Sequence, residues 1–170
     1  MKVKVRVPAT SANLGPGFDV AGLALTLYNT FTFELADQGL NITGCPEQFC
    51  NEENMTYQAF KQAAEICGLE YQGVNIECSG DVPYTRGLGS SSTCIVAGIV
   101  GAFAFKDKVE DRQEILELAT AIEGHPDNVA PAIFGGLTVS VMEEDNVLTL
   151  NIPVKHDYRF VTLIPPFTLS

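Results

Sequence analysis

Two glycines and three successive serines gather in one segment of the chain, between an expected strand and an expected apolar helix. The segment reads Pro83, Tyr84, Thr85, Arg86, Gly87, Leu88, Gly89, Ser90, Ser91, Ser92 and Thr93. The glycines let the backbone approach a ligand closely and adopt dihedral angles that other residues avoid. The serines stand where the helix would begin, so their hydroxyls and the free N–H groups of the first turn point at one spot. This combination predicts a binding site for a phosphate or another anion.

Other well-known loops fit this segment poorly. A P-loop ends in Gly-Lys-Ser or Gly-Lys-Thr, and no lysine follows Gly89. A dinucleotide fingerprint needs a third glycine or an alanine where Ser92 stands, and Asp107 follows the helix rather than a strand, which disfavours an oxidoreductase. A nucleophile elbow needs Gly-x-Ser-x-Gly, which is absent. From this loop alone, an anion site and a serine-rich cap on a buried helix remain equally open.

Two further segments combine with this loop into a recognisable pattern. Residues 8–19 follow P-x-x-S-x-N-L-G-P-G-F-D, residues 83–91 follow P-x-x-x-G-L-G-S-S, and residues 123–132 read E-G-H-P-D-N-V-A-P-A. The three ordered blocks together resemble the GHMP kinases and, within that superfamily, the homoserine kinase family. The third block is the one most specific to homoserine kinases. Because the blocks are spread over residues 8–136, the resemblance covers nearly all of the chain.

The resemblance implies that the phosphates of ATP bind over residues 83–93, with Mg²⁺ bridging the β- and γ-phosphates. A hydroxyl of Ser90 or Ser91 and a carboxylate are then expected at the metal. Glu123 is the first candidate for that carboxylate because it opens the third block. Glu117 is the alternative, since some relatives place the metal-binding glutamate further upstream of the histidine. A plain helix-surface glutamate stays open for both positions.

The resemblance also implies residues for an amino-acid acceptor, L-homoserine. Asn13 and Asp19 match substrate-binding positions, and an aspartate suits the ammonium group of homoserine. His125 and Asn128 match substrate-binding positions near the reacting hydroxyl and are the expected catalytic residues. Structural alternatives remain open: a turn residue for Asn13, and caps of the following helix for His125 and Asn128.

The third block also bears on the mechanism. Many GHMP kinases offer an aspartate as general base where this chain has Asn128, and an amide does not accept a proton at neutral pH. The neighbouring Asp127 is expected to face a different direction. We therefore expect catalysis by positioning and charge neutralisation, with the hydroxyl proton lost late or to phosphate.

The elements that would position these blocks follow from the spacing of apolar residues. Alternation predicts strands over residues 3–7 with Pro8 ending the strand, over 23–35 as one strand or two, and over 40–43, 74–78, 137–141, 147–150 and 160–164. Helical spacing predicts helices over 55–66 before a stop at Gly68, over 90–105 with burial on every side, over 115–122 behind a capping box at Asp111 and Glu114, and shortly after Asp127. This order indicates an α+β fold with a mixed or largely antiparallel sheet.

Composition narrows the range of partners. With 46% hydrophobic and 18% charged residues, the 170-residue chain has a globular composition and the size of one domain. Its net charge of −11 argues against nucleic acid and anionic membranes as partners. The N-terminus lacks the apolar segment of a secretory signal, and no run reaches the length of a membrane span.

The cysteines point to the cytoplasm. Five cysteines without a CxxC pair are typical of reduced thiols in that compartment. Cys45 and Cys50 are five residues apart, but they lack the further His or Cys ligands that a closed zinc site needs.

The resemblance implies that residues 1–170 are the ATP-binding N-terminal domain of a GHMP kinase, of the fold type shared with a ribosomal-protein domain. A C-terminal domain, which in the family supplies another glycine-rich motif and arginines for the substrate carboxylate, is absent. The chain therefore reads as a fragment that is inactive or very weak by itself. Open alternatives are another GHMP-type small-molecule kinase and a non-catalytic nucleotide-binding module of the same fold. A homodimer is also left open.

Overall fold

A computed structural model describes residues 1–17, 19–109, 111–144, 146–154 and 158–164. Within these residues, strands form one sheet: β1 (Lys2–Ser11), β2 (Ala21–Ala36), β3 (Gly39–Thr43), β4 (Gly73–Gly80), β5 (Leu137–Glu143) and β6 (Asn146–Ile152). The helices are α1 (Met55–Cys67), α2 (Ser90–Ala104), α3 (Arg112–Glu123) and α4 (Pro126–Phe134), with short 3-10 turns η1 (Gly15–Gly17) and η2 (Glu47–Phe49). The predicted α+β class is confirmed.

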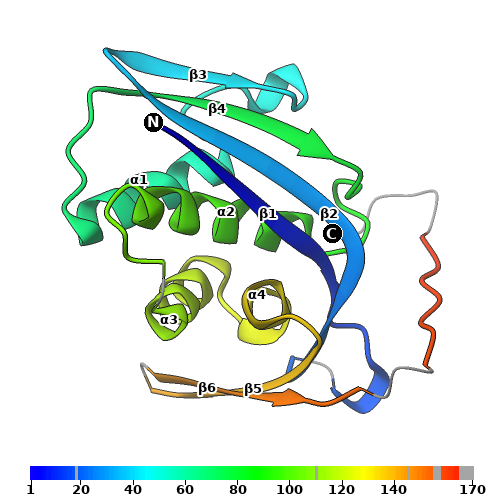
Figure 1. Cartoon of the computed structure of the whole chain (residues 1–170). Helices are drawn as coiled ribbons and strands as arrows, with labels where there is room; N and C mark the ends of the chain where they lie inside the picture. Colours follow the sequence, from blue (N-terminus) through cyan, green and yellow to red (C-terminus); the bar gives the residue numbers. More distant parts are fainter. Residues whose placement is uncertain (18, 110, 145, 155–157, 165–170) are drawn as a thin grey trace.

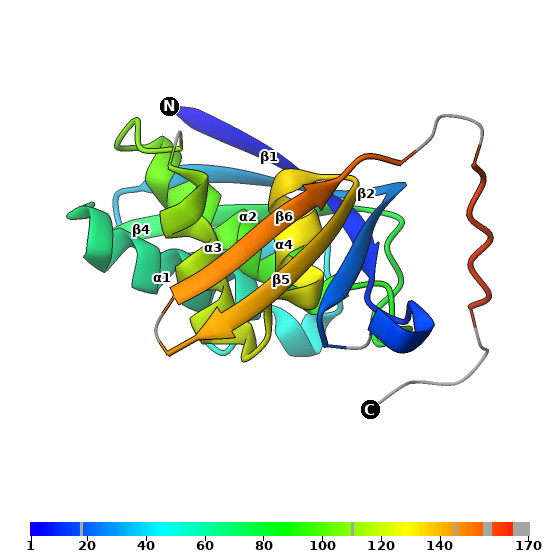
Figure 2. The ribbon, with the colours of Figure 1, turned by 90° about the horizontal axis from the view of Figure 1, so that it is seen from below.

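The sheet is organised on β2, a single strand of 16 residues. β1 pairs antiparallel with it, β4 pairs antiparallel with its residues 29–36, and β5 pairs antiparallel with its residues 21–23. β3 runs parallel to β4, and β6 runs antiparallel to β5, so the sheet is mixed. In Figure 1, β1, β3 and β4 lie above the helices and the β5–β6 hairpin lies below them. Figure 2 shows the same hairpin in front of α4, so the helices are enclosed between the two ends of one curved sheet.

The first strand does not end at Pro8, and that prediction is wrong. β1 continues to Ser11, with a shift of register between Pro8 and Thr10. Because β1 pairs with β2 alone among the described strands, it is an edge strand, where a residue without a backbone N–H donor is tolerated. The extra residues bring Thr10 to the N-terminus of α2.

The last apolar run, residues 160–164, is not a strand, and that prediction is also wrong. Residues 158–164 stand apart from the sheet in Figure 1 and have no assigned helix or strand. None of the described strands pairs with them, so the ladder hydrogen bonds that a strand requires are not made.

The helix ends follow the capping signals in the sequence. Asn54 begins α1 by accepting hydrogen bonds from the N–H groups of Thr56 (2.9 Å) and Tyr57 (3.2 Å). Gly68 ends this helix in the left-handed conformation, as predicted. Asp111 begins α3 through two hydrogen bonds of the same kind to the first turn.

The start of α4 differs from the prediction. The helix begins at Pro126 rather than after Asp127, because proline is pre-organised for the first helical position and needs no N–H partner there. His125 occupies the capping position with extended backbone and without a side-chain cap. Asn128 therefore lies inside the first turn, and its alternative role as the cap of this helix is excluded.

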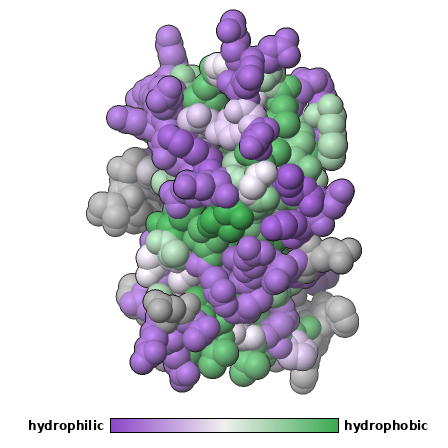
Figure 3. Space-filling model, turned by 90° about the vertical axis from the view of Figure 1, so that its left-hand side faces the viewer, coloured by the Kyte–Doolittle hydropathy of each residue, from purple (hydrophilic) through white to green (hydrophobic). Residues whose placement is uncertain are grey.

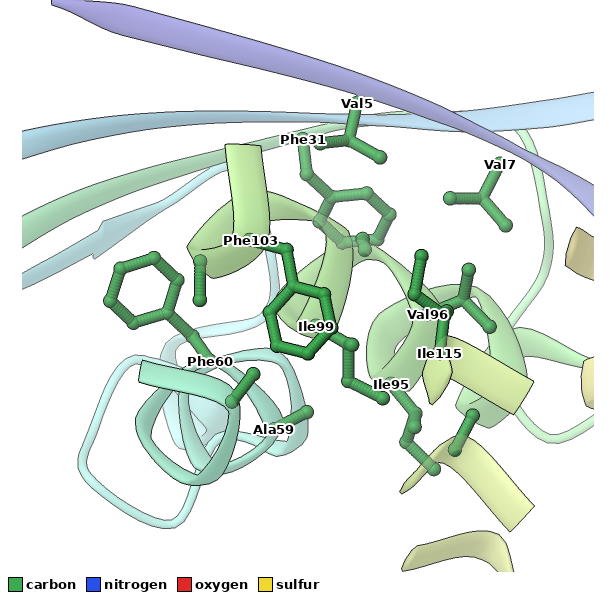
Figure 4. Packing of buried hydrophobic residues seen from close by; sticks show 14 of the residues in the cluster. Val5, Val7, Phe31, Ala59, Phe60, Ile95, Val96, Ile99, Phe103 and Ile115 are labelled. Atoms are coloured by element: carbon green, nitrogen blue, oxygen red, sulfur yellow. The ribbon is translucent and has the colours of Figure 1, made fainter. Parts of the chain in front are cut away.

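The core lies between the sheet and helices α1, α2 and α3. Figure 4 shows Phe60, Ile99 and Phe103 packed beneath Phe31 and Val5 of the sheet. α2 is buried on nearly every side, as predicted. A Cβ on its Gly101 would lie 2.7 Å from the Phe33 ring, so this glycine permits the close approach of helix and sheet. α2 is thus held firmly, and its N-terminus is a fixed point from which a site can be built.

The surface is mostly polar on the face drawn in Figure 3, where hydrophilic side chains predominate and apolar ones gather across the middle and at the lower end. In the part of the chain that the structure describes, none of the helices has both the length and the apolar character needed to cross a membrane.

Candidate active site

Thr10 contacts the loop of residues 83–93, called here the glycine-serine loop. The N–H of this residue donates to the carbonyl of Leu88 (3.1 Å), and Leu88 itself is buried. Gly89 caps α2 with φ +62°, and a Cβ at this position would lie 2.0 Å from Thr10 Oγ1. Only glycine satisfies both the left-handed backbone and the close approach. The loop is therefore seated directly on the end of β1.

Most of the predicted phosphate-binding residues fall into two groups, and Pro83 and Gly89, both half-buried, belong to neither. Those that line cavities are Tyr84, Thr85, Arg86, Gly87, Leu88, Ser90 and Ser91. Ser92 and Thr93 are fully buried instead. Thr93 Oγ1 donates to the carbonyl of Ser90 (2.8 Å) and accepts from Asn29 Nδ2 (3.2 Å), which fixes the first turn of α2 to β2.

Glu123 lies at the end of α3 and faces the start of α2. Its Oε1 accepts hydrogen bonds from Ser91 Oγ (2.6 Å) and Ser92 Oγ (3.2 Å). Glu117, the alternative metal-binding residue, accepts instead from Gln113 Nε2 (2.8 Å) on its own helix. The structure thus brings Glu123 together with Ser91, one of the two serines predicted at the metal, and with Ser92, and it leaves Glu117 outside this group.

The atoms gathered here suit a hard cation. A carboxylate and hydroxyls offer only oxygen ligands, which Mg²⁺ prefers, and this ion commonly takes one or two carboxylates together with substrate phosphates. The oxygen donors of Glu123 and Ser91 therefore fit the metal that the sequence pattern implies, whereas the Ser90 hydroxyl accepts from the N–H of Thr85 (3.4 Å). Among the described residues there is no cluster of three or more His, Cys, Asp or Glu side chains placed to hold a metal.

A hydrogen-bond network links the predicted catalytic residues. His125 Nδ1 bonds to Asp127 Oδ1, and Asp127 is only 3% exposed. Asn128 Nδ2 donates to the same carboxylate oxygen (3.4 Å), and Asn128 Oδ1 accepts from Thr10 Oγ1 (2.9 Å). The expectation that Asp127 faces away from Asn128 is therefore wrong. Both side chains lean toward the N-terminus of α4, the direction that helical side chains take.

Asn13 and Asp19 lie in different cavities. Asp19, exposed and with φ +62°, borders a cavity of about 440 Å³ together with His125. Asn13 borders a cavity of about 610 Å³ together with Arg86 and Gly87 of the loop. Among the described residues, Arg86 Nη1 is buried and has no hydrogen-bond partner. Asp19 thus shares a cavity with His125, and Asn13 shares a cavity with residues of the glycine-serine loop.

An apolar cavity of about 300 Å³ adjoins Ser90 and Ser91, and no sequence pattern predicts it. Its wall comes from several separate elements and includes Phe31, Cys45, Phe49, Met55, Cys78, Tyr84 and Cys94. These residues share no motif spacing, which is why sequence inspection misses the cavity. Its size suits one planar ring system placed beside the loop.

Burial keeps the cysteines of this cavity neutral. It raises the pKa of Cys45 to about 11 and that of Cys78 to about 12, and it also raises the pKa of Cys94. Cys45 Sγ lies 3.5 Å from Cys50 Sγ, and both thiols are free. The cysteines therefore give the cavity wall an uncharged, polarisable part, and Glu53 adds one carboxylate to the lining.

Known proteins match this chain over the three blocks: a family model covers the second and third, and a curated relative covers nearly the whole chain. The family model for the GHMP kinases N terminal domain matches residues 54–136. A homoserine kinase of Clostridium beijerinckii is 51% identical over 169 residues, which are 99% of this chain and 57% of that protein. The chain therefore spans a little more than half the length of this curated relative.

Solved structures agree with the fold. A putative homoserine kinase from Listeria monocytogenes has a TM-score of 0.78 and 36% identity, over 89% of this chain and 54% of its own. A homoserine kinase from Cytophaga hutchinsonii has a TM-score of 0.75 and 30% identity, over 91% of this chain and 52% of its own. The predicted GHMP kinase N-terminal fold is thereby confirmed.

Proposed function

We propose, on the premise that this chain carries the N-terminal domain of the GHMP kinases, that the whole protein transfers the γ-phosphate of ATP to the side-chain hydroxyl of L-homoserine. The product is O-phospho-L-homoserine, a step toward threonine. The homoserine kinases to which the chain is similar, at 51% and 36% identity, support this acceptor.

The observation that carries the proposal is the contact of Glu123 with Ser91 beside the glycine-serine loop. It sets a carboxylate and a hydroxyl at the N-terminus of α2, where free N–H groups favour phosphate oxygens. We assign residues 83–93 to the ATP phosphates and the adjoining apolar cavity to the adenine ring. A chain of net charge −11 then attracts ATP through local groups rather than through its overall field.

Glu123, Ser90 and Ser91 would hold Mg²⁺, which when bound neutralises charge on the β- and γ-phosphates. The serine hydroxyls and the N–H groups of the first turn of α2 orient the phosphates. Gly87 and Gly89 allow the backbone to lie against them. The loop thus contributes positioning and charge stabilisation, which are the main requirements of phosphoryl transfer.

For the acceptor, we assign Asp19 to the ammonium group of homoserine, and Asn13, His125 and Asn128 to the remaining polar contacts. His125 and Asn128 stand nearest to the reacting hydroxyl in this assignment. The buried Asp127 carboxylate bonds to Nδ1 of His125, so the role of Asp127 is to orient the imidazole. The hydroxyl proton is then lost late or to phosphate, without a carboxylate base.

We further propose that residues 1–170 are the ATP-binding domain and that a C-terminal domain completes the substrate site. The chain spans 57% of the length of its homoserine kinase relatives, which supports this division. The 170-residue chain alone is then inactive or very weak. The free cysteines support a cytoplasmic location, and the acidic charge supports a protein that binds neither nucleic acid nor membrane. A homodimer remains open.

A screen of acceptors tests the proposal. The full-length protein is incubated with Mg²⁺ and ATP, and ADP release is compared for homoserine, mevalonate and simple sugars. We expect homoserine to be preferred. Preference for another alcohol would favour a different GHMP-type kinase, and nucleotide binding without transfer to any acceptor would favour a non-catalytic module.

A further inference from the structure

Thr10 is a fully buried hydroxyl residue that none of the assigned roles uses. It is 0% exposed, and it lies at the end of β1 between two parts of the candidate site. Its backbone N–H donates to the carbonyl of Leu88 in the glycine-serine loop (3.1 Å), while its Oγ1 donates to Asn128 Oδ1 in α4 (2.9 Å). The side chain therefore contacts the loop on one side and the acceptor-site helix on the other.

The two hydrogen bonds of the Asn128 side chain define which way its amide faces. Oδ1 is occupied by the Thr10 hydroxyl, and Nδ2 lies 3.4 Å from the carboxylate of Asp127. In the reversed orientation the amide oxygen would face the Asp127 carboxylate, and two acceptors would oppose each other. Asp127 alone holds Nδ2 only weakly at this distance. A hydroxyl can donate or accept, so the Asp127 carboxylate selects which end of the amide faces it, and the shorter bond from Thr10 holds the amide in that orientation.

This orientation decides what Asn128 can offer a ligand. An amide nitrogen carries two hydrogens, and only one of them can point at Asp127. With Oδ1 turned to Thr10, the remaining N–H is the group left for the acceptor site. Asn128 then acts there as a hydrogen-bond donor, which suits the oxygen atoms of a transferring phosphoryl group.

We propose that Thr10 is a positioning residue of this kinase: its hydroxyl holds the Asn128 amide so that an N–H donor, rather than the carbonyl, faces the reacting groups. Thr10 also binds Leu88 of the glycine-serine loop through its backbone N–H. The distance between the Asn128 amide and this loop is therefore held constant by one residue. This inference rests on the proposed function for its catalytic meaning, whereas the orientation itself does not depend on any substrate.

Substitution of Thr10 by Val and by Ser tests the proposal in the full-length protein. Val keeps the shape and the backbone hydrogen bond to Leu88 but removes the hydroxyl. We expect Thr10→Val to lower kcat about tenfold, since one hydrogen bond contributes on the order of a factor of ten, with the KM for ATP within about twofold of wild type. Thr10→Ser should restore kcat to within about threefold. Thr120→Val, a control at a buried threonine whose hydroxyl has no hydrogen-bond partner among the described residues, should leave both constants unchanged.

A double variant separates positioning from simple support of the loop. In an Asn128→Ala background, Thr10→Val should cause no further loss of kcat, because the amide that it orients is gone. Additive losses, or a raised KM for ATP with unchanged kcat, would overturn the proposal in favour of a purely structural role.

The orientation is also measured without turnover, by NMR of the Asn128 side-chain amide in the full-length protein. We expect its two N–H signals to shift in Thr10→Val while the backbone signals of residues 87–91 stay in place. Unchanged Asn128 signals would refute the inference even for an active kinase. Absence of homoserine phosphorylation by the wild-type protein would instead refute the proposed function, and the NMR result would still decide the orientation.

Discussion

Ser91 Oγ donates a hydrogen bond of 2.6 Å to Glu123 Oε1, which joins the first turn of α2 to the last residue of α3. The two residues are 32 positions apart in the chain, and no local pattern requires them to meet. Their contact places a carboxylate at the positive end of α2, where the sequence predicted phosphates. It also distinguishes Glu123 from Glu117, which the sequence pattern leaves open as alternative metal-binding residues.

Replacing Glu123 by Gln should therefore impair the kinase far more than the same change at Glu117. Gln keeps the size and can still accept from Ser91, but it loses the negative charge that would hold Mg²⁺. We expect kcat to fall about 100-fold or more, the scale of losing one charge-stabilising group. Glu117→Gln, on the same helix, should stay near wild type. Rates measured over a range of Mg²⁺ concentrations would check both, and an equal response of the two variants would contradict the assignment.

Gly89 should tolerate alanine much less well than Gly68, although both glycines have left-handed backbone. A Cβ at Gly68 meets nothing within 4 Å, so Gly68→Ala carries only the backbone strain of about 1–2 kcal/mol. A Cβ at Gly89 would lie 2.0 Å from Thr10 Oγ1, which adds about 1–3 kcal/mol of overpacking and displaces the loop. Urea unfolding gives the stability difference, and ATP titration should show weakened binding only for Gly89→Ala. Equal losses of stability would count against the packing seen around Thr10.

Stability should fall as the pH rises above about 9, because buried thiols resist ionisation. Burial raises the pKa of Cys78 from 9.0 to about 12, so below pH 9 the thiol is neutral in both states. Between pH 9 and 12 the unfolded chain releases this proton and the folded chain keeps it, which favours unfolding. Urea unfolding at several alkaline pH values would show the decline, and Cys78→Ala should flatten it. An identical slope in Cys78→Ala would mean that other groups cause the decline.

Asp127→Asn tests whether the network at α4 contains a general base. Under the proposed mechanism Asp127 orients His125 and contacts the Asn128 amide but accepts no proton from the substrate, so the Asn side chain should reduce kcat modestly, by about tenfold, and leave substrate binding unchanged. Rates and binding constants of the full-length variant provide the check. A loss of several orders of magnitude in turnover with intact binding would show that proton abstraction through this carboxylate is essential.

Much of this fold was readable from the sequence because the signals were local. The cap Asp111 and the stop Gly68 mark helix ends directly, and alternation marks several of the strands. The cap role of Asn54 comes from the structure alone. The prediction that β1 ends at Pro8 is wrong because a strand tolerates proline when it lies at the edge of a sheet. That position is a property of the sheet and not of the residue. The predicted start of α4 is too late, because the spacing of apolar residues does not mark Pro126 as the first helical position.

The candidate site was readable only where its residues fall within one motif. The loop of residues 83–93 and the block around His125 have a recognisable spacing. The apolar cavity and the role of Thr10 depend on contacts between distant segments, such as the bond from Thr10 to Asn128 across 118 positions. Such contacts follow from the three-dimensional arrangement and carry no sequence period.

The central claim is phosphoryl transfer to the hydroxyl of homoserine, and identification of the product tests it most directly. The full-length protein is incubated with Mg²⁺, ATP and L-homoserine, and the product is examined by phosphorus NMR and by its resistance to hydroxylamine. The proposal predicts one equivalent of ADP for each equivalent of a hydroxylamine-stable phosphate ester. A hydroxylamine-labile acyl phosphate, or bound ATP that stays intact with homoserine while another alcohol is phosphorylated, would contradict it.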